Sequence, residues 1–137
     1  MLLQALPLHG TVLPPPDPIP VRCGRACVEK TPARRISGIW INYFEGSVFI
    51  EGAQRIEDTR NRRDAPWFEI DDRTEVPRDF RRFYDRAYRV TLDGWRSPIV
   101  PKPDIGGGYG HMGYWHGQIL ADRIVSIEDV GSADLPE

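Results

Sequence analysis

The stretch Ile105–Ile127, IGGGYGHMGYWHGQILADRIVSI, joins a glycine-dense loop to the clearest strand pattern in the chain. We call residues Ile105–Gly117 the glycine loop. Its glycines allow backbone angles that other residues resist, and the large side chains between them can recover order by packing on a sheet or against a partner. Apolar residues then alternate along Gln118–Ile127 except near Ala121–Arg123, where we expect a β-bulge. The stretch therefore predicts a β protein whose last strand follows an aromatic loop.

A β-hairpin is predicted well before this loop. Ile36–Phe44 (ISGIWINYF) is rich in β-branched and aromatic residues and carries bulk on both faces, as does a barrel strand that is covered outside. Glu45-Gly46-Ser47 is a tight-turn signal, and Val48–Ile50 resumes the apolar pattern. Ile36–Glu51 therefore reads as two antiparallel strands.

Two shorter strands and one helix are expected between the hairpin and the glycine loop. Pro66–Ile70 and Ala87–Leu92 are the strands, with Asp71-Asp72 and Asp93-Gly94 marking their ends. Pro77–Asp85 is expected to be a helix, because proline suits a first turn and Phe80, Phe83 and Tyr84 follow helical spacing.

This order of elements resembles a small five-stranded barrel of the OB type, with a helix between its third and fourth strands. The expected fold class is mainly β: a small OB-like or SH3-like antiparallel barrel or roll with one short helix. We expect an extended Pro-rich N-terminal arm over residues 1–35, the barrel domain over 36–130, and an acidic tail over 131–137. Pro14, Pro15, Pro16, Pro18 and Pro20 stiffen the arm, which fits a spacer, or an arm lying on its own domain, better than a ligand for another protein's aromatic groove.

Composition limits the function classes. At 137 residues the chain suits one domain, and its net charge of −2 gives no global attraction to nucleic acid. No run approaches the roughly 20 apolar residues of a membrane helix. We expect a cytoplasmic location; the alternative is export, if the N-terminus is shortened and Cys23 and Cys27 form a disulfide.

Several chemistries find little support in the spacing of residues. Gly108-x-Gly110-x-x-Gly113 matches a dinucleotide fingerprint, but prolines precede it and no helix is expected after it. His111 and His116 are five residues apart, which separates them on a strand or a helix. We therefore predict no cofactor, no metal and no catalytic residues, and lean towards a protein that is not an enzyme.

The leading hypothesis is a non-catalytic binding or assembly module that recognises another protein or itself. Aromatic side chains commonly carry interface energy, and the candidate binding residues are Trp40, Tyr43, Tyr109, His111, Tyr114, Trp115 and His116. One alternative is an OB-like domain that binds single-stranded nucleic acid, with stacking aromatics and a backbone path lined by Arg60, Arg62, Arg63, Arg81 and Arg82. A second alternative is a metal-dependent hydrolase that uses His111 and His116 with a carboxylate such as Asp104 or Glu45.

Overall fold

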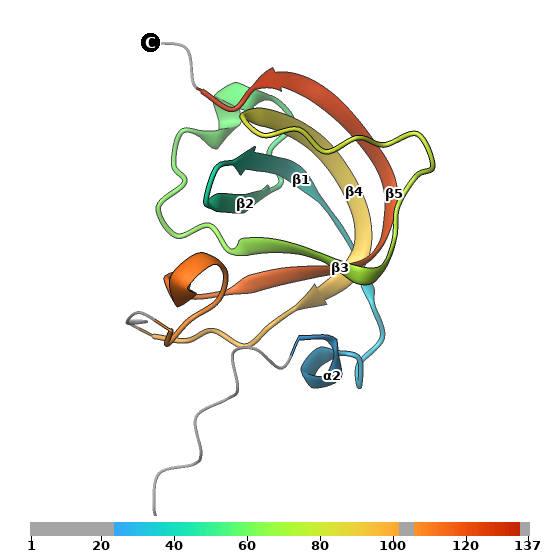
Figure 1. Cartoon of the computed structure of the whole chain (residues 1–137), viewed down its shortest axis with the longest axis vertical. Coiled ribbons are helices and arrows are strands. Elements are labelled where there is room, and N and C mark those ends of the chain that lie inside the picture. The colour runs from blue at the N-terminus through green and yellow to red at the C-terminus, as the bar shows by residue number, and fades with distance from the viewer. Residues whose placement is uncertain (1–23, 102–105, 135–137) are drawn as a thin grey trace, which may run out of the picture.

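The computed structural model describes residues 24–101 and 106–134, which are mainly β (Figure 1). The strands are β1 (Arg34–Tyr43), β2 (Gly46–Glu51), β3 (Trp67–Glu75), β4 (Arg86–Arg96) and β5 (Gln118–Ser132). Helical structure within these ranges is short: α2 (Arg25–Val28) and the 3-10 turns η2 (Ile56–Thr59) and η3 (His111–Gly113). No helix in the described ranges is long and apolar enough to cross a membrane.

The five strands form one sheet whose order, β1-β2-β3-β5-β4, closes on itself. β1 pairs antiparallel with β2 along one edge and with β4 along the other. The β2–β3 seam is the narrowest contact, with Val48 opposite Trp67 and a 3.0 Å hydrogen bond from Phe49 N to Pro66 O. β5 pairs antiparallel with β4 but parallel with β3, so the expectation of a wholly antiparallel sheet is wrong at that seam.

The hairpin and the bulge predicted from sequence are confirmed. β1 and β2 pair from Gly38 opposite Glu51 to Tyr43 opposite Gly46. Near the start of β5, Asp93 faces Arg123 and Gly94 faces Ala121, which leaves Asp122 as the extra residue of a bulge. The two middle strands are longer than expected, because β3 runs on through Asp71-Asp72 and β4 runs on through Asp93-Gly94.

The helix expected at Pro77–Asp85 is absent, and the segment is an irregular loop between β3 and β4. We call residues Val76–Asp85 the cover loop. Phe80 turns inward, with its ring centroid 6.2 Å from that of Trp40 and 5.5 Å from that of Tyr88. The Tyr88 side chain holds the backbone of Phe83, because Tyr88 Oη accepts a hydrogen bond from Phe83 N at 2.9 Å. Tertiary contacts thus hold this segment in place of the backbone hydrogen bonds of a helix. Phe80 packs on the core, whereas Phe83 and Tyr84 are exposed.

The core holds a short polar chain among its aromatic rings. Trp40 is fully buried, and its indole Nε1–H donates to Ser47 Oγ at 2.8 Å. Ser47 Oγ in turn donates to Phe68 O at 2.7 Å. The Ser47 hydroxyl therefore gives a hydrogen-bond partner both to the buried indole of Trp40 and to the Phe68 carbonyl of β3.

We expect Ser47→Ala to destabilise the protein by about 1–3 kcal/mol, because it leaves a buried donor and a buried acceptor without partners. Urea unfolding would measure the change. Ser37→Ala is the matched control: Ser37 lies in the same hairpin but is exposed, so its removal should cost no more than about 0.5 kcal/mol. Equal effects of the two substitutions would contradict the role given to the buried hydroxyl.

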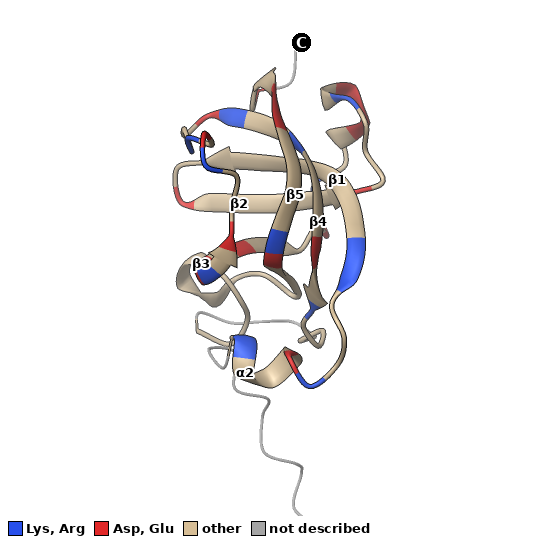
Figure 2. Cartoon of the chain, turned by 90° about the vertical axis from the view of Figure 1, so that its right-hand side faces the viewer, with Lys and Arg blue, Asp and Glu red and all other residues tan. Residues whose placement is uncertain are grey.

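α2 is fixed to the sheet by Arg25, which is 7% exposed. The guanidinium donates to Asp71 from Nε at 3.0 Å and from Nη2 at 2.8 Å, pairs with Asp122 and lies over the Trp95 ring. The hydrogen bond from Arg25 is the main cause that lowers the pKa of Asp71. α2 lies below the strands in Figure 2, within the stretch expected as an extended arm; the proline-rich part of that stretch lies outside the described residues.

The Asp71 carboxylate predicts an acid-dependent stability. Its folded pKa is below the ordinary value of 3.8, so its contribution is present above that pH and is lost as the pH falls through the folded pKa. Asp71→Asn should lower stability at neutral pH and flatten the loss of stability below about pH 4. Denaturant unfolding at several pH values would measure both effects. Asp72→Asn, at the exposed neighbouring carboxylate, should keep the wild-type slope; if Asp71→Asn also keeps it, the ion pair does not act as described.

Candidate functional site

Three loops and the start of β3 surround a pocket of about 400 Å³, which we call the aromatic pocket. Its aromatic lining is Tyr43, Phe44, Trp67 and Tyr84, and its charged or amide lining is Asn42, Glu45, Arg82 and His111. The residues come from the β1–β2 turn, the cover loop and the glycine loop. In Figure 1 the β1–β2 turn and the orange coil of the glycine loop lie on the same side of the sheet.

The β1–β2 turn directs one aromatic ring outward. The turn is Phe44-Glu45, one residue earlier than the sequence signal, and Glu45 has a φ of 60°. Phe44 is 71% exposed, and its ring meets that of Tyr84 edge-on at a centroid distance of 6.4 Å. The turn and the cover loop therefore form one rim of the pocket.

The cover loop is tied to the wall of the pocket by Asn42. Asn42 Nδ2 donates to Phe83 O at 2.8 Å. Its Oδ1 is buried and has no hydrogen-bond partner among the described residues. This amide fixes the loop beside Arg82 and Tyr84 and leaves an acceptor unused in the pocket wall.

The glycine loop folds back on itself and packs on β3. Tyr109 and Trp115 exchange backbone hydrogen bonds of 2.8 and 3.1 Å. The Trp115 ring meets the Trp67 ring edge-on at 4.8 Å. Gly110 lies against the same Trp67 ring, where an added Cβ would be 2.3 Å from the indole. The Trp67 ring thus supports the glycine loop, and this contact places His111 at the aromatic pocket.

We expect Gly110→Ala to displace this loop and to cost at least about 2 kcal/mol, because the new methyl group collides with Trp67 and the residue has a positive φ. Gly106→Ala is the control, since Gly106 has a φ of 80° but no atom within 4 Å of its Cβ position. It should cost about 1 kcal/mol. Urea unfolding followed by tryptophan fluorescence would measure both, and equal costs would contradict the packing described for Gly110.

The structure separates the candidate binding residues into buried and accessible groups. Trp40 is fully buried and Tyr109 is 4% exposed. Tyr109 Oη donates to Pro98 O at 2.6 Å, and burial raises the pKa of this phenol. Tyr43 and Trp115 are half-buried, whereas His111, Tyr114 and His116 are exposed. Trp40 and Tyr109 therefore support the site from within, and a partner in this conformation would meet the others.

The two histidines do not face a common centre. His111 Nε2 lies 3.7 Å from Glu45 Oε2, at the pocket. His116 Nδ1 lies 3.0 Å from Val100 O. In the described ranges no three His, Cys, Asp or Glu side chains are grouped as metal ligands; Asp104 lies outside those ranges.

Of the five arginines considered for nucleic acid, Arg82 alone lines the aromatic pocket. Its guanidinium carbon is 5.1 Å from the centroid of the Trp40 ring. Arg62 is engaged elsewhere: its guanidinium donates to Thr59 O and Ala133 O at 2.9 Å, and burial lowers its pKa. Arg81 bonds to the neighbouring Phe80 O, and Arg60 and Arg63 are exposed.

Sequence reasoning missed three aromatic residues of the pocket, Phe44, Trp67 and Tyr84. The strand pattern Ile36–Phe44 ends on Phe44, and Tyr84 shares the helical spacing of Phe80 and Phe83, so neither pattern predicts a binding residue. A signal for Phe44 was its position beside a turn, where a large apolar side chain is left without strand neighbours. Trp67 gave no such signal, because a tryptophan at the start of a strand suits a core as well as a site.

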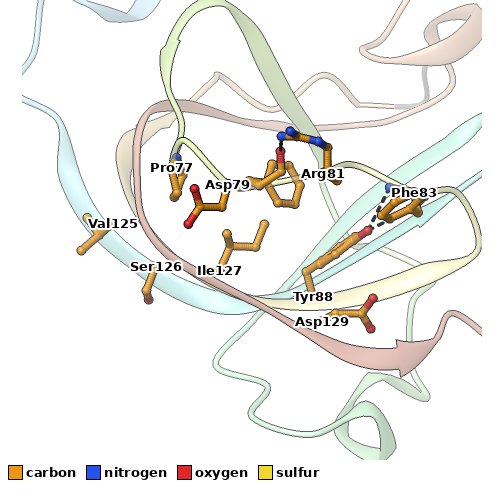
Figure 3. Close-up of a pocket in the computed structure, with 10 residues that line it drawn as sticks. Pro77, Asp79, Arg81, Phe83, Tyr88, Val125, Ser126, Ile127 and Asp129 are labelled. Atoms are coloured by element: carbon orange, nitrogen blue, oxygen red, sulfur yellow. Dashed lines mark hydrogen bonds between the residues drawn. The ribbon is translucent and has the colours of Figure 1, made fainter.

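A second hollow of about 530 Å³ lies under the cover loop, against β4 and β5 (Figure 3). Two of its polar side chains have partners within the chain: Tyr88 Oη binds the Phe83 backbone, and Asp129 accepts from Arg86 at 2.7 Å. Unlike the aromatic pocket, it is lined by no buried side-chain polar atom without a partner in the described ranges. Figure 3 shows the Tyr88 hydroxyl directed at Phe83. This hollow is therefore a weaker candidate than the aromatic pocket.

Comparisons with known proteins add no functional assignment. No family model matches the chain, and neither a curated protein nor a solved structure matches it. The functional argument therefore rests on the geometry of the aromatic pocket.

Proposed function

We propose that this protein is a non-catalytic binding or assembly module that recognises another protein through the aromatic pocket. The observation that carries this proposal is the exposure of Phe44 at 71% and Tyr84 at 64%, side by side at the rim. Large apolar side chains grouped on a surface mark interaction sites more often than scattered ones do. Aromatic residues beside an arginine are also the groups that most often dominate binding energy.

The arrangement of strands supports an OB-like form of the barrel. β1 pairs with both β2 and β4, and β3 pairs in parallel with β5. In OB-type barrels, ligands bind over strands 2 and 3 and the loops between strands 1 and 2 and between strands 4 and 5. The aromatic pocket uses the corresponding loops, through Phe44 and His111. An SH3-like barrel fits less well, because one of the seams here is parallel.

Binding fits the polar groups better than hydrolysis does. A hydrolase would need His111, His116 and a carboxylate within a few ångströms of one another. His111 has Glu45 nearby, while the ring nitrogen of His116 is engaged with Val100 O. His111 and Glu45, which both line the aromatic pocket, are suited to form hydrogen bonds with a ligand.

Protein also fits better than single-stranded nucleic acid. A nucleic-acid path needs several cations that follow the backbone. Only one of the five arginines lies at the pocket, and in Figure 2 basic and acidic segments are interspersed over the face shown. Binding of single-stranded nucleic acid would require a continuous row of basic side chains, which the five candidate arginines do not form at the aromatic pocket.

The state of Cys27 bears on the proposed compartment. Cys27 is disulfide-bonded, and this supports the exported alternative over a cytoplasmic location, because disulfides persist in oxidising compartments.

The test is a selection of peptides from a random library displayed on phage, carried out with the full chain. We expect enriched peptides to bind the wild-type protein and to bind the double variant Phe44→Ser, Tyr84→Ser at least about 30-fold more weakly, the effect of losing one true anchor. Fluorescence polarisation of the labelled peptides would measure this. Val76→Ser is the control, since Val76 is 46% exposed but does not line the pocket.

Two outcomes would count against the proposal. One is that no peptide is enriched, or that the peptides bind the double variant as well as the control. The other is tight binding of an oligo(dT) strand that falls steeply with salt, which would favour the nucleic-acid alternative.

A further inference from the structure

We propose that the aromatic pocket binds the proline-rich segment Leu13–Pro20 (LPPPDPIP) of a second copy of this chain, with the Asp17 carboxylate paired to Arg82. This inference rests on the proposed function and names the partner. It makes the chain a self-assembling module in which the arm of one copy is the ligand of the next.

The chemistry of the pocket suits a proline-rich ligand. Extended proline-rich segments dock in grooves lined by aromatic side chains, because the stiff polyproline conformation loses little entropy on binding. The pocket has four aromatic walls, Tyr43, Phe44, Trp67 and Tyr84. Five of the eight residues in Leu13–Pro20 are prolines, so few backbone donors of such a ligand would be left unpaired.

Charge makes the match more specific. Arg82 stacks over the buried Trp40 ring, and within the described ranges it has no acidic partner. Asp17 is the sole charged residue of Leu13–Pro20, and prolines flank it on both sides. A carboxylate held in a stiff segment could pair with a guanidinium that an aromatic ring already positions.

The fold favours an arm from another copy. α2 packs beside Trp95, near the Arg34 end of β1, whereas the pocket is at the Asn42 end. The eight residue steps between those ends span at most about 27 Å of strand. An arm of the same copy would have to run along most of that length, with the seven residues between Asp17 and Gly24 extended, before Asp17 met Arg82. An arm from a second copy has no such constraint, and repeated exchange builds either closed rings or open chains.

The test uses two full-length charge-reversal variants, Asp17→Arg and Arg82→Asp, in sedimentation velocity experiments. The wild-type protein should associate with increasing concentration. Each variant alone should associate at least about tenfold more weakly, because each places like charges together. An equimolar mixture of the two should recover association, since the altered arm of one matches the altered pocket of the other. Recovery on mixing requires contact between copies and is not expected from a general loss of stability.

Controls separate this inference from the proposed function. Arg78→Asp reverses an exposed charge in the same loop and should leave association unchanged. A labelled peptide spanning Leu13–Pro20 should bind the wild-type protein, and its version with all five prolines replaced by glycine should bind at least about tenfold more weakly. A wild-type protein that stays monomeric and ignores this peptide overturns the inference, while binding of library peptides at the same pocket would still uphold the proposed function.

Discussion

Closure of the sheet depends on β1 pairing along both of its edges, and this pairing needs a residue without a side chain at Gly38. Gly38 faces Glu51 of β2 on one side and Val90 of β4 on the other. A Cβ there would lie 2.3 Å from Ile50 O and 2.7 Å from the Phe49 ring. The backbones can approach this closely because glycine presents no such atom. With β1 paired on both edges, the sheet closes through the β2–β3, β3–β5 and β5–β4 seams.

The position of the pocket follows from that closure. With β1 bent around the core, the turn after Tyr43 lies beside the cover loop that precedes β4, and the two are joined by Asn42 and by the Phe44–Tyr84 ring contact. The narrow β2–β3 seam places Trp67 at the edge of the same region. Trp67 then supports the glycine loop. Closure of the sheet thus gathers three loops that are far apart in the sequence.

The sequence predicted the strands because apolar periodicity reports which side of a strand is buried, and it predicted the Asp122 bulge because the period fails there. It could not predict the parallel β3–β5 seam, since side-chain alternation is the same for either strand direction. The prediction of a helix at Pro77–Asp85 is wrong for a related reason. Helical spacing of aromatic residues records only that they are three and four apart, whereas Phe80 is drawn into the core by Trp40 and Tyr88. The pair Asp93-Gly94 predicts the end of a strand, yet Gly94 lies within β4, beside the bulge.

The candidate site was predictable in part, and the division within the glycine loop shows why. A ring in such a loop either packs against the body or faces outward, and the residue type does not decide between them. Here the Tyr109 ring is buried, whereas the Trp115 ring rests on Trp67 and stays half-buried. Met112 and Tyr114, between them in sequence, are 50% and 48% exposed. The loop is already fixed by its own backbone hydrogen bonds and by contact with Trp67. A partner that bound its outward side chains would therefore lose little conformational entropy in ordering the loop.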